Sequence, residues 1–424
     1  MKQLKVVLIG AGGRGRNYTD LMDSEKFKVV GVAEPIKDRR EYIRDKHNIP
    51  DEMCFNTWEP LLELPKFADV AIISTMDQLH HAPALAAIEK GYDLLLEKPV
   101  SNQYSECVEI ANAAKEKGTK ILVCHVLRYT PFFMAIKKMI DDNKIGKVLS
   151  VHHSENVGHL HQSHSFVRGN WGNSQKSSFM LLQKSCHDMD IIQWLVGSPC
   201  KKVHSFGSLS YFTRENAPEG SPEYCYEGCP HKDTCHYDAT ALYSKDSNEW
   251  FAGHALQKAD ATEEDYINLQ RNTQYGKCVF KCDNDVVDHQ VVNLEFESGA
   301  VASFNMCAFN EGGRFIRIMG TEGEIYGSAK NNTLEYFSFK TGEKTTFDAA
   351  SNDLTDSIVH GHGGGDEGIV ETLYKYLAEG YESDQLSLID ISTKNHLIAF
   401  AAEKSRLENK VINIEEFQKE AGLE

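Results

Sequence analysis

Long hydrophobic runs are missing from this sequence, since no apolar stretch approaches the roughly 18 residues that a membrane-spanning helix needs. Basic residues are also outnumbered, with 45 Lys and Arg against 62 Asp and Glu and a formal net charge of −17. This balance disfavours nucleic acid and anionic membranes as partners. The N-terminus carries no signal-peptide pattern, because it enters a strand-like run at Leu4. We therefore expect a cytoplasmic protein that binds neither nucleic acid nor a membrane.

Internal repeats and low-complexity linkers are absent as well, and the content of 41% hydrophobic and 25% charged residues is typical of globular domains. A chain of 424 residues is too long for one ordinary core and suits two domains. Eleven cysteines in a large intracellular chain are expected to be free thiols or metal ligands rather than disulfides.

Strand-like and helical stretches alternate over residues 1–125, which predicts an α/β Rossmann domain with a doubly wound parallel sheet. Its expected strands include Ala68–Ser74, Tyr92–Leu96 and Lys120–Cys124, and its helices His80–Lys90 and Ser105–Lys117. Residues 126–424 are expected to form an α+β domain with an open, mostly antiparallel sheet, because strand-like runs separated by Gly and Asn turns dominate from residue 286. The elements expected there are strands at Lys147–Glu155, Val286–Phe296, Ala300–Ala308 and Phe315–Met319, and helices at Tyr129–Asp142, Phe179–Leu195, Glu367–Ala378 and Ser392–Leu407. We expect the last two helices to pack on that sheet or to return to the first domain.

The chain starts with a strand, turn, helix and strand pattern that is typical of a dinucleotide-binding unit. The apolar run Leu4–Ile9 leads into Gly10-Ala11-Gly12-Gly13-Arg14-Gly15, and a second run, Phe27–Ala33, ends at Glu34. A side chain at Gly10 or Gly12 would hold the backbone away from a pyrophosphate, and one at Gly15 would hold the helix off the sheet. The amides at the start of the helix then favour the negative phosphates. The expected coenzyme contacts are therefore Gly10, Gly12, Gly13, Arg14 and Gly15.

Glu34 is placed to accept hydrogen bonds from the ribose hydroxyls of the coenzyme. Its carboxylate would repel a 2′-phosphate, which favours NAD over NADP. Lys37, Arg39 and Arg40 follow closely and could offset this repulsion, so NADP stays open.

The tripeptide Glu97-Lys98-Pro99 follows the expected strand Tyr92–Leu96, at the carboxyl edge of the sheet where open α/β folds bind ligands. In this tripeptide and several further motifs the chain resembles the Gfo/Idh/MocA oxidoreductases, named for glucose-fructose oxidoreductase and inositol dehydrogenase. Those motifs are the glycine turn, Ser74-Thr75 with His80, Leu127-Arg128-Tyr129, His187-Asp188-Met189-Asp190 and the run from Ala401 to Arg406. The resemblance implies that Lys98 contacts the substrate hydroxyl and the nicotinamide ribose. It also implies that Ser74, Thr75, His80 and Glu97 belong to the coenzyme site.

His187 is the expected proton acceptor, because passing hydride from a secondary alcohol to nicotinamide requires a group that takes the hydroxyl proton. The family commonly has an aspartate four residues before this histidine, where the present chain has Gln183. The carboxylate half of the proton relay is therefore missing. Lys184 is a further catalytic candidate, since a nearby cation would lower the pKa of His187, although Lys184 could equally be noncatalytic. Asp190 is expected to hold the helix and the histidine in place.

The expected substrate site combines a histidine-rich loop with a planar aromatic ring, which suits the hydroxyl edge and the apolar face of a sugar. Its candidates are Arg128, Tyr129, His161, Arg168, Trp171, Lys184 and His187. His362, in a glycine-rich run before a helix, matches a family loop that approaches the substrate, and an ordinary helix entry is the alternative. A metal at His159, His161 and His164 is not expected, because no carboxylate or cysteine stands at a fixed spacing from them.

A cysteine-rich insertion spans about residues 212–284. Thiolates spaced by three to five residues can close on one tetrahedral ion, so a structural zinc site at Cys225, Cys229, Cys235 and Cys278 is one hypothesis, with an iron–sulfur cluster less favoured. Cys282 would then be spare. Free buried thiols are the main alternative, and disulfides a lesser one.

These patterns together predict an NAD-dependent dehydrogenase acting on the CH–OH group of a sugar, polyol or sugar derivative. An NAD-dependent glycoside hydrolase or lyase that oxidises its sugar transiently is the alternative. A noncatalytic dinucleotide sensor is a third, disfavoured because Lys98 and His187 are both retained. The resemblance further implies a homodimer or homotetramer.

Overall fold

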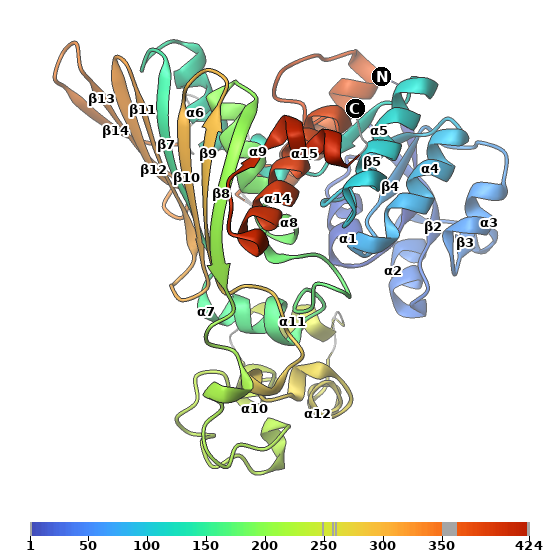
Figure 1. Ribbon diagram of the computed structural model, residues 1–424. Coiled ribbons are helices and arrows are strands. Elements are labelled where there is room, and N and C mark those ends of the chain that lie inside the picture. The colour runs from blue at the N-terminus through green and yellow to red at the C-terminus, as the bar shows by residue number, and fades with distance from the viewer. Residues whose placement is uncertain (1, 248–249, 257, 259–260, 350–362, 422–424) are drawn as a thin grey trace.

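The computed structural model describes residues 2–247, 250–256, 258, 261–349 and 363–421 and confirms both expected sheets (Figure 1). Within these residues six parallel strands form the first sheet, in the spatial order β3-β2-β1-β4-β5-β6. The strands are β1 (Leu4–Ile9), β2 (Phe27–Ala33), β3 (Cys54–Phe55), β4 (Val70–Ile73), β5 (Asp93–Leu96) and β6 (Ile121–Val123). The helices between them are α1 (Gly13–Asp20), α2 (Lys37–His47), α3 (Trp58–Glu63), α4 (His81–Glu89) and α5 (Tyr104–Lys117). The strand order reverses between β1 and β4, which creates the crevice where doubly wound sheets bind ligands.

The second sheet is larger, with nine strands in the described part of the chain, ordered β14-β13-β12-β11-β7-β10-β9-β8-β15. Its strands are β7 (Val148–Asn156), β8 (Cys200–Ser208), β9 (His289–Phe296), β10 (Val301–Cys307), β11 (Gly313–Gly320), β12 (Gly323–Ser328), β13 (Thr333–Ser338), β14 (Lys344–Asp348) and β15 (Ile412–Asn413). β7 and β10 run parallel, and the other described neighbours run antiparallel. The sheet is therefore mostly antiparallel, as expected, and β7 lies at its centre. The sequence did not predict five of its strands, which are β8, β12, β13, β14 and β15.

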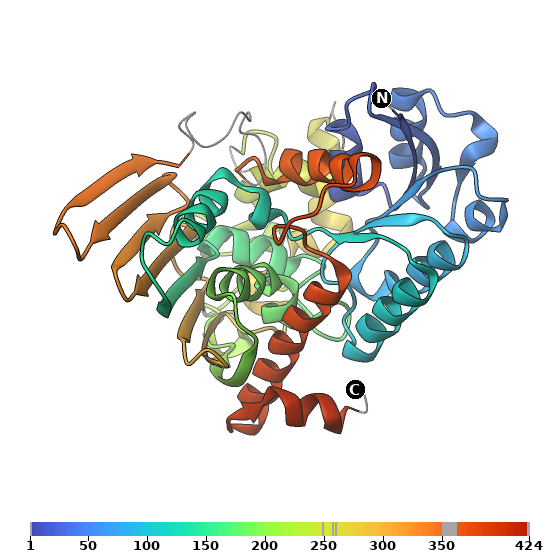
Figure 2. The same cartoon turned by 90° about the horizontal axis from the view of Figure 1, so that it is seen from above.

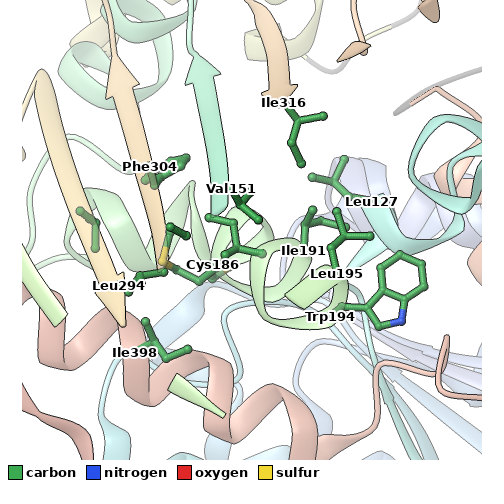
Figure 3. Close-up of a cluster of buried hydrophobic side chains, with 14 of the residues drawn as sticks. Leu127, Val151, Cys186, Ile191, Trp194, Leu195, Leu294, Phe304, Ile316 and Ile398 are labelled. Atoms are coloured by element: carbon green, nitrogen blue, oxygen red, sulfur yellow. The ribbon is translucent and has the colours of Figure 1, made fainter. Parts of the chain in front are cut away.

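Helices cover one face of this second sheet. The side chains of Ile191 and Leu195 on α9 (Cys186–Val196) join a buried cluster with Val151, Phe304 and Ile316 from the strands (Figure 3). Alternate residues of β10 are buried, as a sheet with one packed face requires. α6 (Pro131–Asp141), which begins with a Thr130 cap and a proline in its first turn, completes this layer.

The single helix expected over Phe179–Leu195 is in fact two helices, α8 (Met180–Gln183) and α9. Lys184 and Ser185 lie between them, and Ser185 has φ −103° and ψ 9°, which is outside the helical range. The break matters because it separates Lys184 from His187, which occupies the first turn of α9.

The C-terminal helices join the two domains (Figure 2). α13 (Gly365–Tyr374) returns to the first domain, where Ile369, Leu373 and Tyr374 share a buried cluster with β1, β2 and β4. α14 (Ile389–Glu408) packs on both β8 and α5, and α15 (Ile414–Glu420) follows it. Both alternatives weighed for the late helices therefore occur: α13 returns to the first domain, and α14 packs on the second sheet and on the first domain.

The insertion between β8 and β9 forms a separate group of short helices below the second sheet (Figure 1). It contains α10 (Ala239–Leu242), α11 (Trp250–Leu256) and α12 (Glu263–Asn272). Two small aromatic clusters hold it together, one around Phe212 and Phe280 and the other around Tyr243 and Phe251. None of the described helices, here or elsewhere, is long and apolar enough to cross a membrane.

Candidate active site

The glycine turn after β1 is closely packed against the end of β4. Gly10 has φ +90°, and a Cβ there would stand 2.7 Å from the carbonyl oxygen of Ser74. The Ser74 hydroxyl donates to the Gly10 carbonyl at 2.7 Å. A Cβ at Gly15 would stand 2.1 Å from that same carbonyl, whereas one at Gly12 would meet nothing nearer than the Arg39 guanidinium at 3.9 Å. Gly10 and Gly15 are thus needed for packing, and the space beside Gly12 is open for the close approach of a ligand.

This contrast gives a testable prediction. Gly15→Ala should disrupt the turn and lower the melting temperature, because the new methyl overlaps backbone that cannot move independently. Gly12→Ala should leave the melting temperature of the free protein unchanged and weaken NAD binding by about tenfold or more, because its methyl enters only ligand space. Calorimetry with NAD and a thermal melt of each variant check both. Tight NAD binding by Gly12→Ala would show that the coenzyme lies elsewhere.

Glu34 directly follows β2, and its carboxylate is turned back onto the glycine turn. One carboxylate oxygen accepts from the backbone N–H of Ala11 at 2.7 Å and the other from that of Ile36 at 2.9 Å. Arg40 donates to the Glu34 carbonyl. The backbone therefore orients the carboxylate at the crevice, with lone pairs left for ribose hydroxyls.

A buried ionic network connects the glycine turn to the Glu97-Lys98-Pro99 edge of the sheet. Arg14 donates to Glu97 at 2.9 Å and to Asp366 at 2.6 Å, and the Tyr18 hydroxyl donates to Glu97 at 2.6 Å. Burial alone would raise the pKa of Glu97, but the positive charges of Arg14 and Lys98 bring it below its usual value. Asp366 stands at the start of α13, so this network also fixes the returning helix.

Lys98 reaches from the Rossmann sheet to the second domain. Its Nζ donates to the carbonyl oxygen of Gln183 at 2.9 Å, at the end of α8. His80 bridges the neighbouring loops, with its ring nitrogens 2.8 Å from the Pro99 carbonyl and 3.1 Å from the Thr75 carbonyl. The structure thus brings Lys98 together with the helix pair that carries Lys184 and His187.

His187 belongs to a row of buried imidazoles. Its ring meets that of His125 edge-on at 5.6 Å, and the His125 ring meets that of His396 in the same way at 5.6 Å. Nε2 of His396 accepts the Val100 amide at 3.0 Å, so the ring proton is on Nδ1, which donates to the Ser392 carbonyl at 2.7 Å. The sequence did not indicate that His125 or His396 is a neighbour of the site. His125 follows β6 and His396 lies on α14, so both are far from His187 along the chain.

A carboxylate does stand next to Lys184, but it comes from β7. Nζ of Lys184 lies 3.5 Å from Oε1 of Glu155, and the guanidinium of Arg314 pairs with both Glu155 and Asp188. Burial lowers the pKa of Lys184. The negative charge of Glu155 opposes this effect, and the positive charges of Arg314 and Lys98 lower the pKa of Lys184 further. Glu155 is thus an acidic partner of Lys184 and Arg314. Sequence reasoning missed it because Glu155 and Arg314 face each other only through strand register.

Comparison with known proteins agrees with this architecture. Residues 4–125 match the model of an oxidoreductase family with an NAD-binding Rossmann fold, and residues 137–391 match that family's C-terminal alpha/beta domain. The chain belongs to the Gfo/Idh/MocA family of oxidoreductases. It is accordingly an NAD-binding enzyme, as the resemblance implied.

Among its relatives in the Gfo/Idh/MocA family is a protein of Bacillus subtilis (strain 168) named as an oxidoreductase, YteT. It is 26% identical over 377 residues, which cover 83% of each chain. The 2,7-anhydro-N-acetylneuraminate hydratase of Escherichia coli (strain K12) is 28% identical over 203 residues, 47% of this chain and 51% of the hydratase. A solved structure of levoglucosan dehydrogenase, in complex with NADH and levoglucosan, superposes with a TM-score of 0.70 at 18% identity, over 97% of this chain and all of that one.

Three residues expected to bind substrate form hydrogen bonds with other residues of this chain. Arg128 is buried and forms a two-pronged ion pair with Asp190 at 2.7 and 2.8 Å. Tyr129 bonds through its hydroxyl with Ser387 at 2.9 Å. Arg168 donates to the carbonyl oxygens of Lys277 and Tyr237 at 2.8 and 2.6 Å. These contacts give the three residues a structural explanation that the sequence did not suggest.

The remaining substrate candidates are His161, Trp171 and His362. His161 ends α7 (His159–His161), and burial, then the charge of Lys184, lower the pKa of its imidazole. Trp171 is half-buried and packs against Phe166, with ring centroids 6.2 Å apart. His362 lies outside the described residues.

The expected zinc site at Cys225, Cys229, Cys235 and Cys278 is not supported. Within the described residues no group of three His, Cys, Asp or Glu side chains is arranged to hold a metal ion. Burial raises the pKa of the Cys225 thiol to about 11. The Sγ of Cys225 instead lies 3.9 Å from the Lys277 carbonyl, and Cys278 packs in the apolar cluster around Phe212. The described cysteines are free thiols, and Cys225, Cys235, Cys278 and Cys282 pack in the two apolar clusters of the insertion.

Proposed function

We propose that this enzyme is an NAD-dependent dehydrogenase that transfers hydride between nicotinamide and a hydroxyl-bearing carbon of a sugar, polyol or sugar derivative. The observation that carries the proposal is the contact of Lys98 with the Gln183 carbonyl. It joins the coenzyme edge of the Rossmann sheet to the pair of helices that holds the proton-accepting candidates. A likeness in fold to levoglucosan dehydrogenase also supports it.

In this proposal NAD, when bound, supplies the acceptor for the hydride that leaves the substrate carbon. Lys98 donates a hydrogen bond to the substrate hydroxyl oxygen and orients the C–H bond. His187 accepts the hydroxyl proton as the carbon–oxygen double bond forms. Lys184, whose pKa is lowered chiefly by burial, is the second candidate for holding that proton, with Glu155 beside it.

The residues at the crevice support NAD rather than NADP as the coenzyme. The Glu34 carboxylate is buried and fixed by two backbone amides, so it cannot turn away from a 2′-phosphate. Arg40, one of the cations that could have offset its charge, is engaged with the Glu34 carbonyl.

The redox-neutral alternative has its own support in the likeness to the 2,7-anhydro-N-acetylneuraminate hydratase. In such a reaction the sugar is oxidised, loses a group by elimination and is reduced again. Lys184 and His187 would then supply the base for the elimination.

One assay separates the two functions. Purified enzyme is incubated with a panel of sugars, polyols and glycosides, with NAD or NADP. A dehydrogenase accumulates NADH, which is followed by its absorbance, whereas the redox-neutral enzyme yields a changed sugar by mass spectrometry without net NADH. We expect NADH to accumulate with NAD and a sugar or polyol. The absence of any product with either coenzyme would overturn the proposal. The cytoplasmic location and the assembly into a homodimer or homotetramer stay predictions.

A further inference from the structure

The insertion presents an exposed aromatic ring that the sequence did not indicate. Trp250 is the first residue of α11, and 53% of its surface is exposed. Such exposure is unusual for tryptophan, whose large ring is normally mostly buried. By contrast, Trp171, the aromatic residue expected to meet the sugar, packs against Phe166.

Trp250 is held in a defined orientation. Its ring meets the rings of His161, His164 and His254 edge-on, with centroids 5.4, 5.8 and 5.0 Å away. Three such contacts restrict the orientation of the ring, while about half of the residue stays exposed to solvent.

The segment that carries Trp250 is itself anchored. His164 is stacked between Phe251 at 4.8 Å and Tyr275 at 5.1 Å, and its Nδ1 bonds with the Tyr243 hydroxyl at 2.9 Å. Arg168, in the same helical turn as His164, donates to the backbone of the insertion at Lys277 and Tyr237. The insertion is thereby fixed to the stretch that follows β7.

That stretch leads directly to the catalytic candidates. His161, which Trp250 contacts, ends α7, and α7 follows β7, the strand whose Glu155 lies 3.5 Å from the Nζ of Lys184. Trp250 is thus linked through His161 to the strand that carries Glu155.

We propose that Trp250 is the stacking platform for the apolar face of the sugar, and that it sets the preference for substrates with a flat C–H face. This inference rests on the proposed function. A sugar ring on the open face of Trp250 would direct its hydroxyl edge toward His161 and Lys184. Aromatic platforms of this kind supply apolar contact, and a few polar groups then fix orientation.

The test compares Trp250→Ala, Trp250→Tyr and Trp250→Phe with a Trp58→Phe control in the coenzyme domain, using levoglucosan, D-glucose and myo-inositol with NAD. Trp250→Ala should raise KM for the oxidised sugar about tenfold with kcat within about twofold, since stacking contributes to ground-state and transition-state binding alike. Trp250→Tyr should restore most of the loss. The sugar should change the tryptophan fluorescence of the NAD-loaded protein and of Trp58→Phe but not that of Trp250→Phe.

The outcomes are distinguishable. If the unaltered enzyme oxidises one of these sugars and Trp250→Ala has the same KM, or if the fluorescence change persists in Trp250→Phe, the stacking role is overturned and the dehydrogenase stands. If the unaltered enzyme oxidises none of the three, both the dehydrogenase function toward these sugars and the stacking role fall.

Discussion

Lys98→Met should reduce kcat by about a thousandfold or more while NAD still binds, because in the proposed function the lost cation holds the substrate hydroxyl during hydride transfer. The Lys98 Nζ lies 2.9 Å from the carbonyl oxygen of Gln183. This contact joins the edge of the Rossmann sheet to the helices that carry the proton-acceptor candidates. Methionine preserves most of the apolar stem, so the loss is confined to the charge and its donors. NADH formation with the sugar that serves best in the panel measures the effect, and calorimetry measures NAD affinity.

A matched control is Lys90→Met, at the exposed C-terminus of α4 and away from the sheet edge. It should leave kcat, KM and NAD affinity unchanged. If Lys98→Met turned over at the rate of the unaltered enzyme, the catalytic assignment of the Glu97-Lys98-Pro99 edge would be wrong. If it lost NAD binding as well, Lys98 would be a coenzyme anchor and not a group that acts on the substrate hydroxyl.

Asp190→Ala should destabilise the protein by about 3–5 kcal/mol, because it leaves the buried Arg128 guanidinium without its counter-charge. Arg128 and Asp190 have side chains that are 2% and 0% exposed and form two parallel hydrogen bonds. Asn395 on α14 also donates to Asp190, so the same carboxylate ties the second domain to the helix between the domains. Urea unfolding followed by circular dichroism measures the change in midpoint.

The control for this prediction is an exposed pair. Glu89→Ala removes the partner of Lys117, whose pairing distance is 2.7 Å but whose side chains are 45% and 70% exposed for Lys117 and Glu89. Its cost should be below about 1 kcal/mol, since solvent screens surface pairs. Equal shifts for both variants would contradict a specific role for the buried pair.

The same pair gives the protein a pH dependence of stability. Burial would raise the pKa of Asp190, but the charge of Arg128 and the hydrogen bonds to the carboxylate bring it below its ordinary value. A carboxyl whose folded-state pKa is lowered stabilises the fold above its unfolded pKa of about 3.9, and that contribution is lost as the pH falls further. Between neutral pH and about pH 3, the free energy of unfolding should therefore fall by less in Asp190→Ala than in the unaltered protein.

Local sequence patterns were sufficient for the coenzyme domain. The strands expected at Leu4–Ile9 and Phe27–Ala33 have those bounds in the structure, because a buried parallel strand is a short apolar run with turns at both ends. The glycine turn was equally predictable, since a position that has positive φ or no room for a Cβ admits little but glycine. The edge position of Lys98 followed from the strand before it.

The tertiary structure alone decided which groups surround the reacting centre. Glu155 meets Lys184 because β7 lies at the centre of a sheet whose strands come from distant parts of the chain, and Asp190 pairs with Arg128 across two helical segments. The thiols of the insertion looked like metal ligands by spacing, but their neighbours are carbonyls and aromatic rings. Spacing along a chain fixes only contacts within a turn or a helix, whereas these partners depend on sheet register and on long-range packing.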